Sequence, residues 1–497
     1  MVRTDQRPPF DAIVRQTAAG LSWTAVALLV GFAAKLVLAR KMPPDAMGIL
    51  MAAQSLVALT LAVAELGMPD AVVRFVGLDA SGDAAPGRTV SIALKMAAVT
   101  AMLASVVVLA GLLGWFGASM TVEALWTTVI LTATLPLLAV GDVLGAAYRG
   151  VNRLGTKLFI IDVARPACLV LAVLVSPVML TRHAPYVAGL NAAAALLIAA
   201  GFWGLFKKDG RWRSHGASAR DLLRFGLPSA AAAVIAGPLV TSALPLILSA
   251  WPGPTAVALY MVTLSLQAVV YLPVGVLELA ALPTWARMTA HDTAEMLAGS
   301  FKQFTNIGFA GATSIGLVVM ANDDAILSRA FGPAYVAASL ALRIAIVTQL
   351  CTSWTGPSEA MLRALGLTTS IFKARVAAAV AGLTAAAAFV PGYGLTGGIM
   401  AFAISSVVVS GLEAVFVYRA CRIHPFARPH AITTAMAAGG VLVVTAFGEV
   451  YPPGAWIVAH TLAVMALVVN ADVRLAVQNL SRSARNAITK TNAASWK

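Results

Sequence analysis

Charged side chains are scarce in this chain: only 11% of its 497 residues are Asp, Glu, Lys or Arg. A soluble protein carries about 25% charged residues, and these cover its surface. Here 60% of the residues are hydrophobic and the mean hydropathy is +0.85, so there are too few polar groups to coat a core of this size. The composition excludes a soluble globular protein and predicts a chain surrounded by lipid.

Cysteine is rare as well. Cys168, Cys351 and Cys421 lie within or beside apolar runs and show no metal-type spacing. We interpret them as packing residues and expect no metal site and no cofactor. The sequence also lacks a glycine-rich loop that ends in Lys-Ser or Lys-Thr, so it encodes no ATP-hydrolysing module of that type.

One motif of soluble enzymes does occur, because Gly392, Gly394 and Gly397 have the spacing GxGxxG. A dinucleotide site of this kind needs a preceding strand and a following helix that opens on the phosphates. Here the preceding element is a long apolar run that Pro391 ends. The spacing therefore predicts a tight turn between two membrane helices.

Apolar runs of about twenty residues, long enough to cross the hydrocarbon core, fill most of the chain. The first run follows several charged residues and has no small-residue cleavage site, which favours a retained helix over a removable signal. The predicted fold is an all-α polytopic membrane protein of about fourteen helices. The predicted spans are 18–39, 47–67, 89–112, 122–147, 158–180, 184–206, 225–249, 255–281, 302–320, 336–358, 367–390, 396–419, 430–449 and 453–472.

Basic residues gather in alternate loops of this map. When the N-terminus is placed inside, most of the 35 Lys and Arg fall in inner loops and tails. The predicted outer loops contain only Arg40, Lys41, Arg182 and Arg329. This distribution obeys the positive-inside rule, so the net charge of +14 reflects topology and not a nucleic-acid partner. We expect a multi-pass protein of a bacterial inner membrane with both termini in the cytoplasm.

A hydrophilic connection divides the chain, and similar segments recur on its two sides at nearly the same offset. One pair is 46–51 with 256–261, and another is 146–150 with 360–364. Such repeats favour two duplicated bundles. The predicted organisation is an N-terminal six-helix lobe at 1–206, a cytoplasmic linker at 207–224, a second six-helix lobe at 225–420, an extra helix pair at 429–472 and a basic cytoplasmic tail at 473–497.

Short motifs follow one another in a fixed order between residues 14 and 425. They are 36–42 with 46–48, 65–68 leading to Arg74-Phe75, 223–228, 331–335, 361–366 and 390–398. Their ordered series resembles the polysaccharide transporter family, the oligosaccharide flippases of the multidrug/oligosaccharidyl-lipid/polysaccharide exporter (MOP) superfamily. The last two predicted helices lie outside a twelve-helix core and resemble the extra pair of lipid II flippases, which contributes a groove for the lipid tail. The sequence gives no independent sign of such a groove.

The resemblance implies two lobes that face each other and open alternately to either side, with no enzymatic step. It implies transport of an undecaprenyl-pyrophosphate-linked oligosaccharide from the inner to the outer leaflet, for O-antigen lipopolysaccharide, capsule or exopolysaccharide synthesis. The lipid-linked glycan and membrane lipids are the implied partners, and a polysaccharide polymerase is a further candidate partner.

Ionisable side chains inside predicted spans are candidate site residues, because a charge in hydrocarbon usually marks a cavity or a partner. The basic candidates are Lys35, Lys95, Arg165 and Arg343. Ammonium and guanidinium groups donate hydrogen bonds to phosphate oxygens, so these four residues are predicted to line a cavity that binds pyrophosphate. Lys35 and Lys95 have an alternative role, since long side chains near a helix end can extend to the membrane interface.

Two pairs of opposite charge have helical spacing. Arg165 follows Asp162 by three residues, and Arg363 follows Glu359 by four, so each pair can lie on one helix face. The first pair is interpreted as cavity lining or as an ion pair that fixes helix packing. The second lies near a predicted span end and is interpreted as a structural pair or a gate.

Three prolines fall in one predicted span. Pro228, Pro238 and Pro245 each remove a backbone hydrogen bond within 225–249 and favour a bend. A span bent at several points at the start of the second lobe is a candidate hinge for alternating access. The alternative is a static kink, since proline is common in membrane helices.

Two other functions remain open from the sequence. A drug/cation antiporter of the same superfamily is expected to carry an acid-rich cation site in one lobe, and Glu65 and Glu413 are isolated acids that are candidates for coupling to a cation. A membrane polysaccharide polymerase is expected to have a long outer loop or an acidic catalytic pair beside a soluble domain. Neither feature occurs here, so we expect the protein not to be an enzyme.

Overall fold

The computed structural model describes residues 10–79, 85–116, 120–151, 153–208, 212–213, 216–236, 238–291, 294–424, 428–447 and 452–469. The predicted basic tail at 473–497 lies outside the described residues, as does part of the predicted linker at 207–224.

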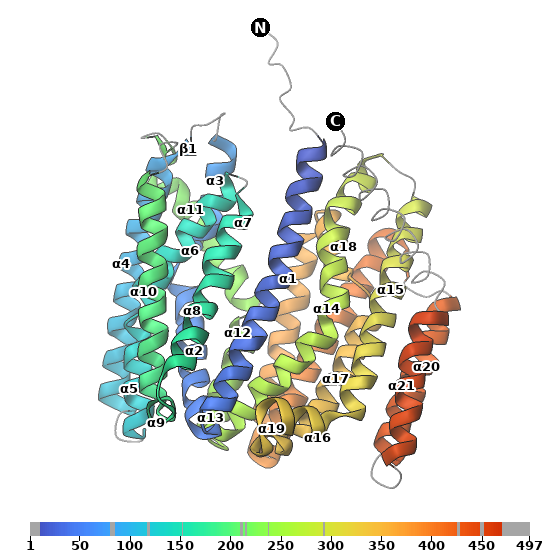
Figure 1. The fold of residues 1–497 in the computed structure, drawn as a ribbon. Helices are drawn as coiled ribbons and strands as arrows, with labels where there is room; N and C mark the ends of the chain where they lie inside the picture. The colour runs from blue at the N-terminus through green and yellow to red at the C-terminus, as the bar shows by residue number, and fades with distance from the viewer. Residues whose placement is uncertain are drawn as a thin grey trace, which may run out of the picture. The chain divides into compact units, whose positions relative to one another are not determined.

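Long apolar helices make up the first half of the chain (Figure 1). Two two-residue strands, β1 (Ala85–Pro86) and β2 (Trp212–Arg213), pair in parallel. The helices are α1 (Phe10–Lys41), α2 (Pro44–Ala64), α3 (Met68–Asp79), α4 (Gly87–Gly111), the π-helix η1 (Leu112–Phe116), α5 (Val122–Thr132), α6 (Leu135–Gly150), α7 (Leu154–Lys157), the π-helix η2 (Leu158–Ala164), α8 (Arg165–Val175), α9 (Val178–Thr181) and α10 (Ala184–Lys208).

The second half is helical as well, with several short elements between the long helices. Its helices are α11 (Ala219–Ala236), α12 (Pro238–Thr241), α13 (Ala243–Ala250), α14 (Pro254–His291), α15 (Ala294–Ala321), α16 (Asp323–Ile326), the π-helix η3 (Leu327–Phe331), the 3₁₀-helix η4 (Pro333–Ala338), α17 (Ser339–Trp354), α18 (Ser358–Ala364), α19 (Thr368–Cys421), α20 (Arg428–Phe447) and α21 (Pro452–Val469).

The predicted all-α polytopic fold is confirmed. Within the described residues, nine stretches are long and apolar enough to cross a membrane. Helix α1, the broken run α11–α13, the second half of α19, and the pair α20 and α21 supply the remaining predicted spans. Helix α19 counts twice because Gly394, with φ 54° and ψ −123°, interrupts it shortly after Pro391. The turn predicted from the glycine spacing therefore lies where the sequence places it.

Contacts within the chain divide it into two compact units. Unit 1 comprises Met1–Val262, Ser328–Ala337 and Ala379–Phe402, and unit 2 comprises Thr263–Leu327, Ala338–Ala378 and Ala403–Lys497. The boundaries fall inside α14, η3, η4 and α19, so neither of the long helices α14 and α19 belongs to one unit alone. The division into lobes at 1–206 and 225–420 stays a prediction.

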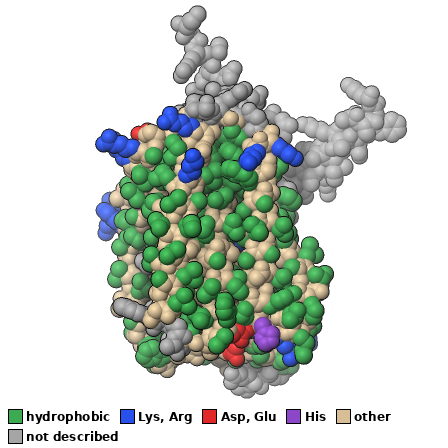
Figure 2. All heavy atoms as spheres, turned by 90° about the vertical axis from the view of Figure 1, so that its left-hand side faces the viewer, with side chains coloured by type: hydrophobic (Ala, Val, Ile, Leu, Met, Phe, Trp, Pro, Cys, Tyr) green, Lys and Arg blue, Asp and Glu red, His purple; other side chains and the backbone are tan. Residues whose placement is uncertain are grey.

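One face of the molecule has the surface expected of a protein in a bilayer. Figure 2 shows hydrophobic side chains over the middle of this face, with Lys and Arg gathered mainly toward one end. Many large apolar side chains on the long helices are exposed, for example Leu103 and Val107 of α4 and Leu197 of α10. Such a surface is stable against lipid and would be a severe liability in water.

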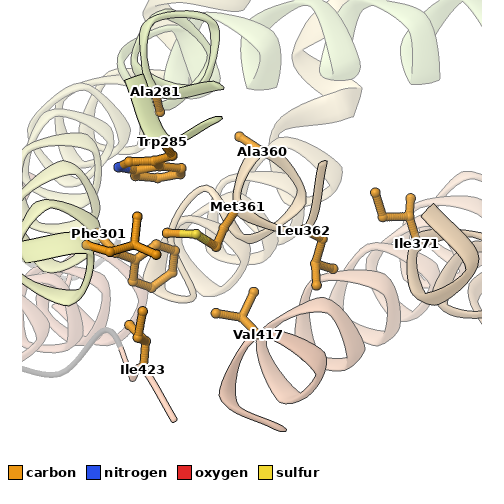
Figure 3. Packing of buried hydrophobic residues seen from close by; sticks show 10 residues of the cluster. Ala281, Trp285, Phe301, Ala360, Met361, Leu362, Ile371, Val417 and Ile423 are labelled. Carbon is orange, nitrogen blue, oxygen red and sulfur yellow. The ribbon is translucent and has the colours of Figure 1, made fainter. Parts of the chain in front are cut away.

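Aromatic and aliphatic side chains form a dense cluster in unit 2, where α14, α15, α18 and α19 meet (Figure 3). The indole ring of Trp285 is fully buried, and its centroid lies 5.6 Å from that of Phe301. The indole Nε1 donates a hydrogen bond of 3.0 Å to the hydroxyl of Ser300, so burial leaves no unpaired donor. Met361 and Val417 pack against the same cluster and tie the four helices together.

We expect Trp285→Ala to lower the free energy of unfolding by about 3–5 kcal/mol, because it removes a large buried ring and leaves a cavity. The measurement is the thermal midpoint of the purified protein in detergent, or its unfolding in a titration of SDS. Trp126→Ala is the matched control: Trp126 on α5 is 56% exposed, and its loss should change stability by less than about 0.5 kcal/mol. Equal effects of the two substitutions would contradict the assignment of this core.

Candidate functional site

A cavity of about 660 Å³ lies inside unit 1, where α1, α2, α6 and the segment η2–α8 approach one another. Most of its wall is aliphatic. Polar side chains are few. They are Lys35 on α1, Gln54 on α2, Thr134 before α6, Asp162 on η2, Arg165 on α8 and Asn191 on α10. A largely apolar cavity with a small number of converging polar groups is the usual form of a small-ligand site.

The predicted cations Lys35 and Arg165 both line this cavity. Arg165 is the first residue of α8, at the point where the π-helix η2 changes to an α-helix. The next residue, Pro166, has no backbone N–H to donate, and a π-helical widening accommodates the missing hydrogen bond. The sequence therefore produces a local irregularity that carries a charged side chain at the cavity wall, and such irregularities occur often at functional sites.

Asp162 forms its ion pair with a different partner from the one expected. Its Oδ2 lies 2.6 Å from Nζ of Lys157, five residues earlier, whereas the sequence spacing favoured Arg165. In a π-helix the residues i and i+5 stack on one face, so the three-residue relation that holds for an α-helix does not apply. Within the described chain Arg165 forms no ion pair, and the carboxylate that acts on it electrostatically is Asp142 of α6.

Asp142 also contacts Glu65, which follows the last residue of α2. The two carboxyl groups interact electrostatically, so Glu65 is not the isolated acid that the sequence suggests. The chain bends here: Leu66 and Gly67 have positive φ values of 49° and 70°, and α3 starts at Met68.

The other two predicted cations are not part of this cavity. Lys95 is exposed on α4 and does not line it. Arg343, on α17 of unit 2, has its Nε 2.6 Å from Oδ2 of Asp323, a buried carboxylate at the start of α16. Helical spacing could not predict this partner of Arg343, because Asp323 lies twenty residues earlier in a separate helix, α16.

A small polar cavity of about 210 Å³ lies in unit 2 and is lined by Glu359, one member of the predicted pair Glu359 and Arg363. The two residues form an ion pair, and Glu359 also accepts a hydrogen bond of 2.6 Å from Arg375. Glu413 on α19 lines the same cavity, is 6% exposed, and has an Oε1 atom without a hydrogen-bond partner. Glu278 completes an acidic group in which carboxylates outnumber the lining cation Arg375.

Sequence reasoning missed Glu278 and its partner Tyr271. The hydroxyl of Tyr271 donates a hydrogen bond to Glu278 two helical turns later on α14. Their spacing of seven residues was a signal for a common helix face. An acid inside an apolar span was a second signal, of the kind that selected Glu413.

An apolar cavity of about 540 Å³, also inside unit 2, has α20 as one wall. Phe309, Leu350, Trp354 and Val441 line it, so its surface is almost entirely hydrocarbon. The indole Nε1 of Trp354 donates to Thr434 on α20 at 3.1 Å and fixes the ring against this helix. The cavity shows that one helix of the extra pair shapes an apolar recess, which the sequence alone did not indicate.

Within unit 1, the start of α2 contacts the start of α14. The hydroxyl of Thr255 donates to the carboxylate of Asp45, and a Cβ on Gly48 would lie only 1.8 Å from the carbonyl oxygen of Pro254. Only glycine permits this approach of the two backbones. The segment η3–η4 also contacts the first two helices within unit 1. The hydroxyl of Tyr335 lies 3.1 Å from Sδ of Met47, and Nε of Arg40 donates to the carbonyl oxygen of Ala330 at 2.6 Å.

The predicted span 225–249 is occupied by α11, α12 and α13, and only one of its three prolines begins a helix. Pro228 lies inside α11, α12 begins at Pro238, and Pro245 lies inside α13. Among the described residues of this run, a turn at Ser242 separates α12 from α13. That this segment acts as a hinge stays a prediction.

No protein-family model matches the chain, and no curated protein does. Solved structures are similar to it. The lipid II flippase MurJ in an inward closed conformation is 12% identical, with 89% of this chain and 96% of that chain covered at a TM-score of 0.67. A multidrug resistance MATE family transporter of the MOP superfamily, in an inward-facing conformation, is 14% identical over 82% and 98% of the two chains at a TM-score of 0.60.

A MOP superfamily transporter from Pyrococcus furiosus, described as having a binding pocket of reverse polarity, is 16% identical over 83% of this chain and 95% of that chain, at a TM-score of 0.53. Identities this low establish the fold and leave cargo open. The chain has the fold shared by the MATE and MurJ transporters of the MOP superfamily.

Proposed function

We propose that the protein is an alternating-access flippase of the polysaccharide transporter type. Its cargo is an undecaprenyl-pyrophosphate-linked oligosaccharide, which it moves from the inner to the outer leaflet of a bacterial inner membrane for surface polysaccharide synthesis. The observation that carries this proposal is the cavity of unit 1, whose mostly aliphatic wall contains both Lys35 and Arg165.

A pyrophosphate that enters a membrane protein loses water from its charged oxygens, and fixed cations must replace that water. Arg165 presents a planar group of N–H donors, and Lys35 adds a mobile ammonium group on the facing helix. The amides of Gln54 and Asn191 line the same cavity and suit hydroxyl groups of the first sugar, since an amide both donates and accepts. A cation in apolar surroundings is costly, and an anionic ligand in the cavity would lower that cost.

The apolar cavity of unit 2 supports the lipid half of the cargo. An undecaprenyl chain has no polar atoms, and the recess beside α20 offers hydrocarbon and aromatic surface along its wall. The comparable feature of lipid II flippases, an extra helix pair beside the core, agrees with this assignment. Phe309 and Trp354 are the aromatic contacts that a prenyl tail would meet.

The contacts between the start of α2 and the start of α14 support alternating access. In the predicted topology these helix starts lie at the outer side of the membrane, so Asp45, Thr255 and the approach at Gly48 hold the outer side closed. Release of cargo into the outer leaflet requires these contacts to separate. The interrupted run α11–α13 precedes α14 directly and provides places where the chain can bend.

The direct test is reconstitution of the purified protein into vesicles with a defined undecaprenyl-pyrophosphate-linked oligosaccharide. Translocation is read as the fraction of glycan that becomes accessible to an added glycosidase. The proposal predicts transfer above protein-free vesicles, and much slower transfer by the Arg165→Ala protein. Vesicles that export a cationic dye against a cation gradient, and do not transfer the glycan, would instead identify a drug/cation antiporter.

The small polar cavity of unit 2, which Glu413 lines, favours coupling of transport to a cation or proton. A buried carboxylate oxygen without a hydrogen-bond partner is costly when the group is ionised, and Oε1 of Glu413 could be satisfied by a proton or a bound cation. We expect Glu413→Gln, which keeps the size of the side chain, to abolish stimulation of flipping by an imposed sodium or proton gradient. Flipping without a gradient should persist. Gradient stimulation equal to wild type would remove Glu413 from the coupling mechanism.

A further inference from the structure

A second polar cavity in unit 2, of about 680 Å³, is not used by the proposed transport step. It lies where α15 ends, α16 and α17 begin, and α20 and α21 are joined. In the predicted topology the connections near 291–294, 364–368 and 421–428 lie on the inner side of the membrane. The cavity lies at the other ends of the helices that these connections join, and therefore at the outer side. The extra helix pair contributes Val444, Ala455 and Trp456 to its wall.

Trp456 gives this cavity a fixed aromatic surface. The indole is 47% exposed, yet its Nε1 donates a hydrogen bond of 2.8 Å to Oδ1 of Asn322. Asn322 is itself held, since its Nδ2 donates to the carbonyl oxygen of Val318 at 2.7 Å and lies 3.3 Å from Nε2 of His460. The His460 ring packs against the indole with a centroid separation of 4.0 Å. Simple anchoring at a membrane interface does not require this support.

The polar groups of the cavity suit a ligand rich in hydroxyl groups. Asp324 is exposed, whereas Asp323 is buried and forms the ion pair with Arg343 at 2.6 Å. The hydroxyl of Ser339 adds a further donor and acceptor. One carboxylate in excess disfavours a phosphate and favours O–H donors, which form short, strong hydrogen bonds to carboxylate oxygens.

We propose that this cavity binds a saccharide unit. The weakly positive C–H face of a sugar ring packs on the negative π face of Trp456, and its hydroxyls donate to Asp324. The inference rests on the proposed function in one respect: the saccharide is taken to be part of the transported glycan, held at the outer side after the lipid has crossed. The binding chemistry itself depends only on the cavity.

The test uses saturation-transfer-difference NMR on the full-length protein in nanodiscs, with glucose, galactose, rhamnose and N-acetylglucosamine as separate probes at millimolar concentration. We expect at least one sugar to receive saturation, strongest at its ring C–H protons. Trp456→Ala should weaken that binding about fivefold to tenfold, whereas Trp456→Phe retains most of it, since the stacking surface persists. Asp324→Asn should weaken binding through the hydroxyl contacts, with the thermal midpoint unchanged because Asp324 is exposed.

Trp251→Ala is the matched control, because Trp251 is also an exposed tryptophan, at 67%, and does not line the cavity. The proposal is overturned if no probe receives saturation from the wild-type protein, or if saturation is the same in Trp456→Ala. It is also overturned if phosphocholine or phosphoethanolamine, and no sugar, shows the dependence on Trp456, which would identify a lipid headgroup site. Flipping without sugar binding defeats this inference alone, and sugar binding without flipping defeats the proposed function alone.

Discussion

Arg165→Ala should lower the rate of glycan flipping about 100-fold in reconstituted vesicles. The residue lines the unit 1 cavity at the start of α8 and forms no ion pair with a described residue, so its hydrogen-bond donors are available to a pyrophosphate. Removing a charge-assisted contact of this type costs about 1.5–3 kcal/mol, and about 2.7 kcal/mol corresponds to 100-fold in binding. Lys35→Ala should act in the same direction with a smaller effect, because an ammonium group is a less directional donor.

The controls for Arg165 separate charge from folding. Arg165→Lys keeps the positive charge and loses the planar array of donors, so it should retain intermediate activity. Lys95→Ala removes a cation that is exposed on α4 and absent from the cavity wall, and it should flip at the wild-type rate. All variants should show the wild-type thermal midpoint. Wild-type flipping by Arg165→Ala and Lys35→Ala together would eliminate this cavity as the pyrophosphate site.

The membrane fold could be predicted from the sequence because it depends on long-range composition. Runs of about twenty apolar residues and the bias of Lys and Arg toward alternate loops are set by the thickness and asymmetry of the bilayer. Even the break near Gly394 could be predicted, since Pro391 ends a helix and a glycine accepts a positive φ. Neither the membrane spans nor this break depends on a contact between distant residues.

The partners of charged residues could be predicted only in part. Glu359 and Arg363 pair at the four-residue spacing that an ordinary α-helix dictates. The π-helix η2 changes which residues share a face, and it joins Asp162 to Lys157. A π-helix depends on how surrounding helices pack, and this information is absent from local spacing.

Contacts between separate helices could not be predicted either, because they also depend on how the helices pack. The approach of Asp142 to Glu65 joins two helices, and the pairing of Asp323 with Arg343 joins two others. Nothing in one chain's spacing marks such pairs in advance. An acidic residue in an apolar span can be recognised from the sequence alone, because burying its charge is costly. Glu65 and Glu413 could therefore be predicted as candidate residues, but the residues that contact them could not.

A covalent link between α2 and α14 should stop flipping. Thr255 and Asp45 are hydrogen-bonded through their side chains, so cysteines at both positions are within reach of each other or of a short bismaleimide. In a background without Cys168, Cys351 and Cys421, we expect crosslinked Asp45→Cys/Thr255→Cys to flip glycan at the rate of protein-free vesicles. The reason is that a closed outer side cannot release cargo, however well the cargo binds.

The oxidised disulfide should be fully reversible, so addition of dithiothreitol should return flipping to its starting rate. Each single-cysteine protein should be unaffected by oxidation. A matched pair, Glu123→Cys/Ala184→Cys, joins α5 and α10, which also contact each other through Glu123 and the backbone of Ala184 but both belong to the predicted first lobe. That link should leave flipping unchanged, because the two helices move together. Flipping at the wild-type rate by the fully crosslinked α2–α14 protein would mean that these helix starts stay in contact throughout the cycle, and the outer side would have to open elsewhere.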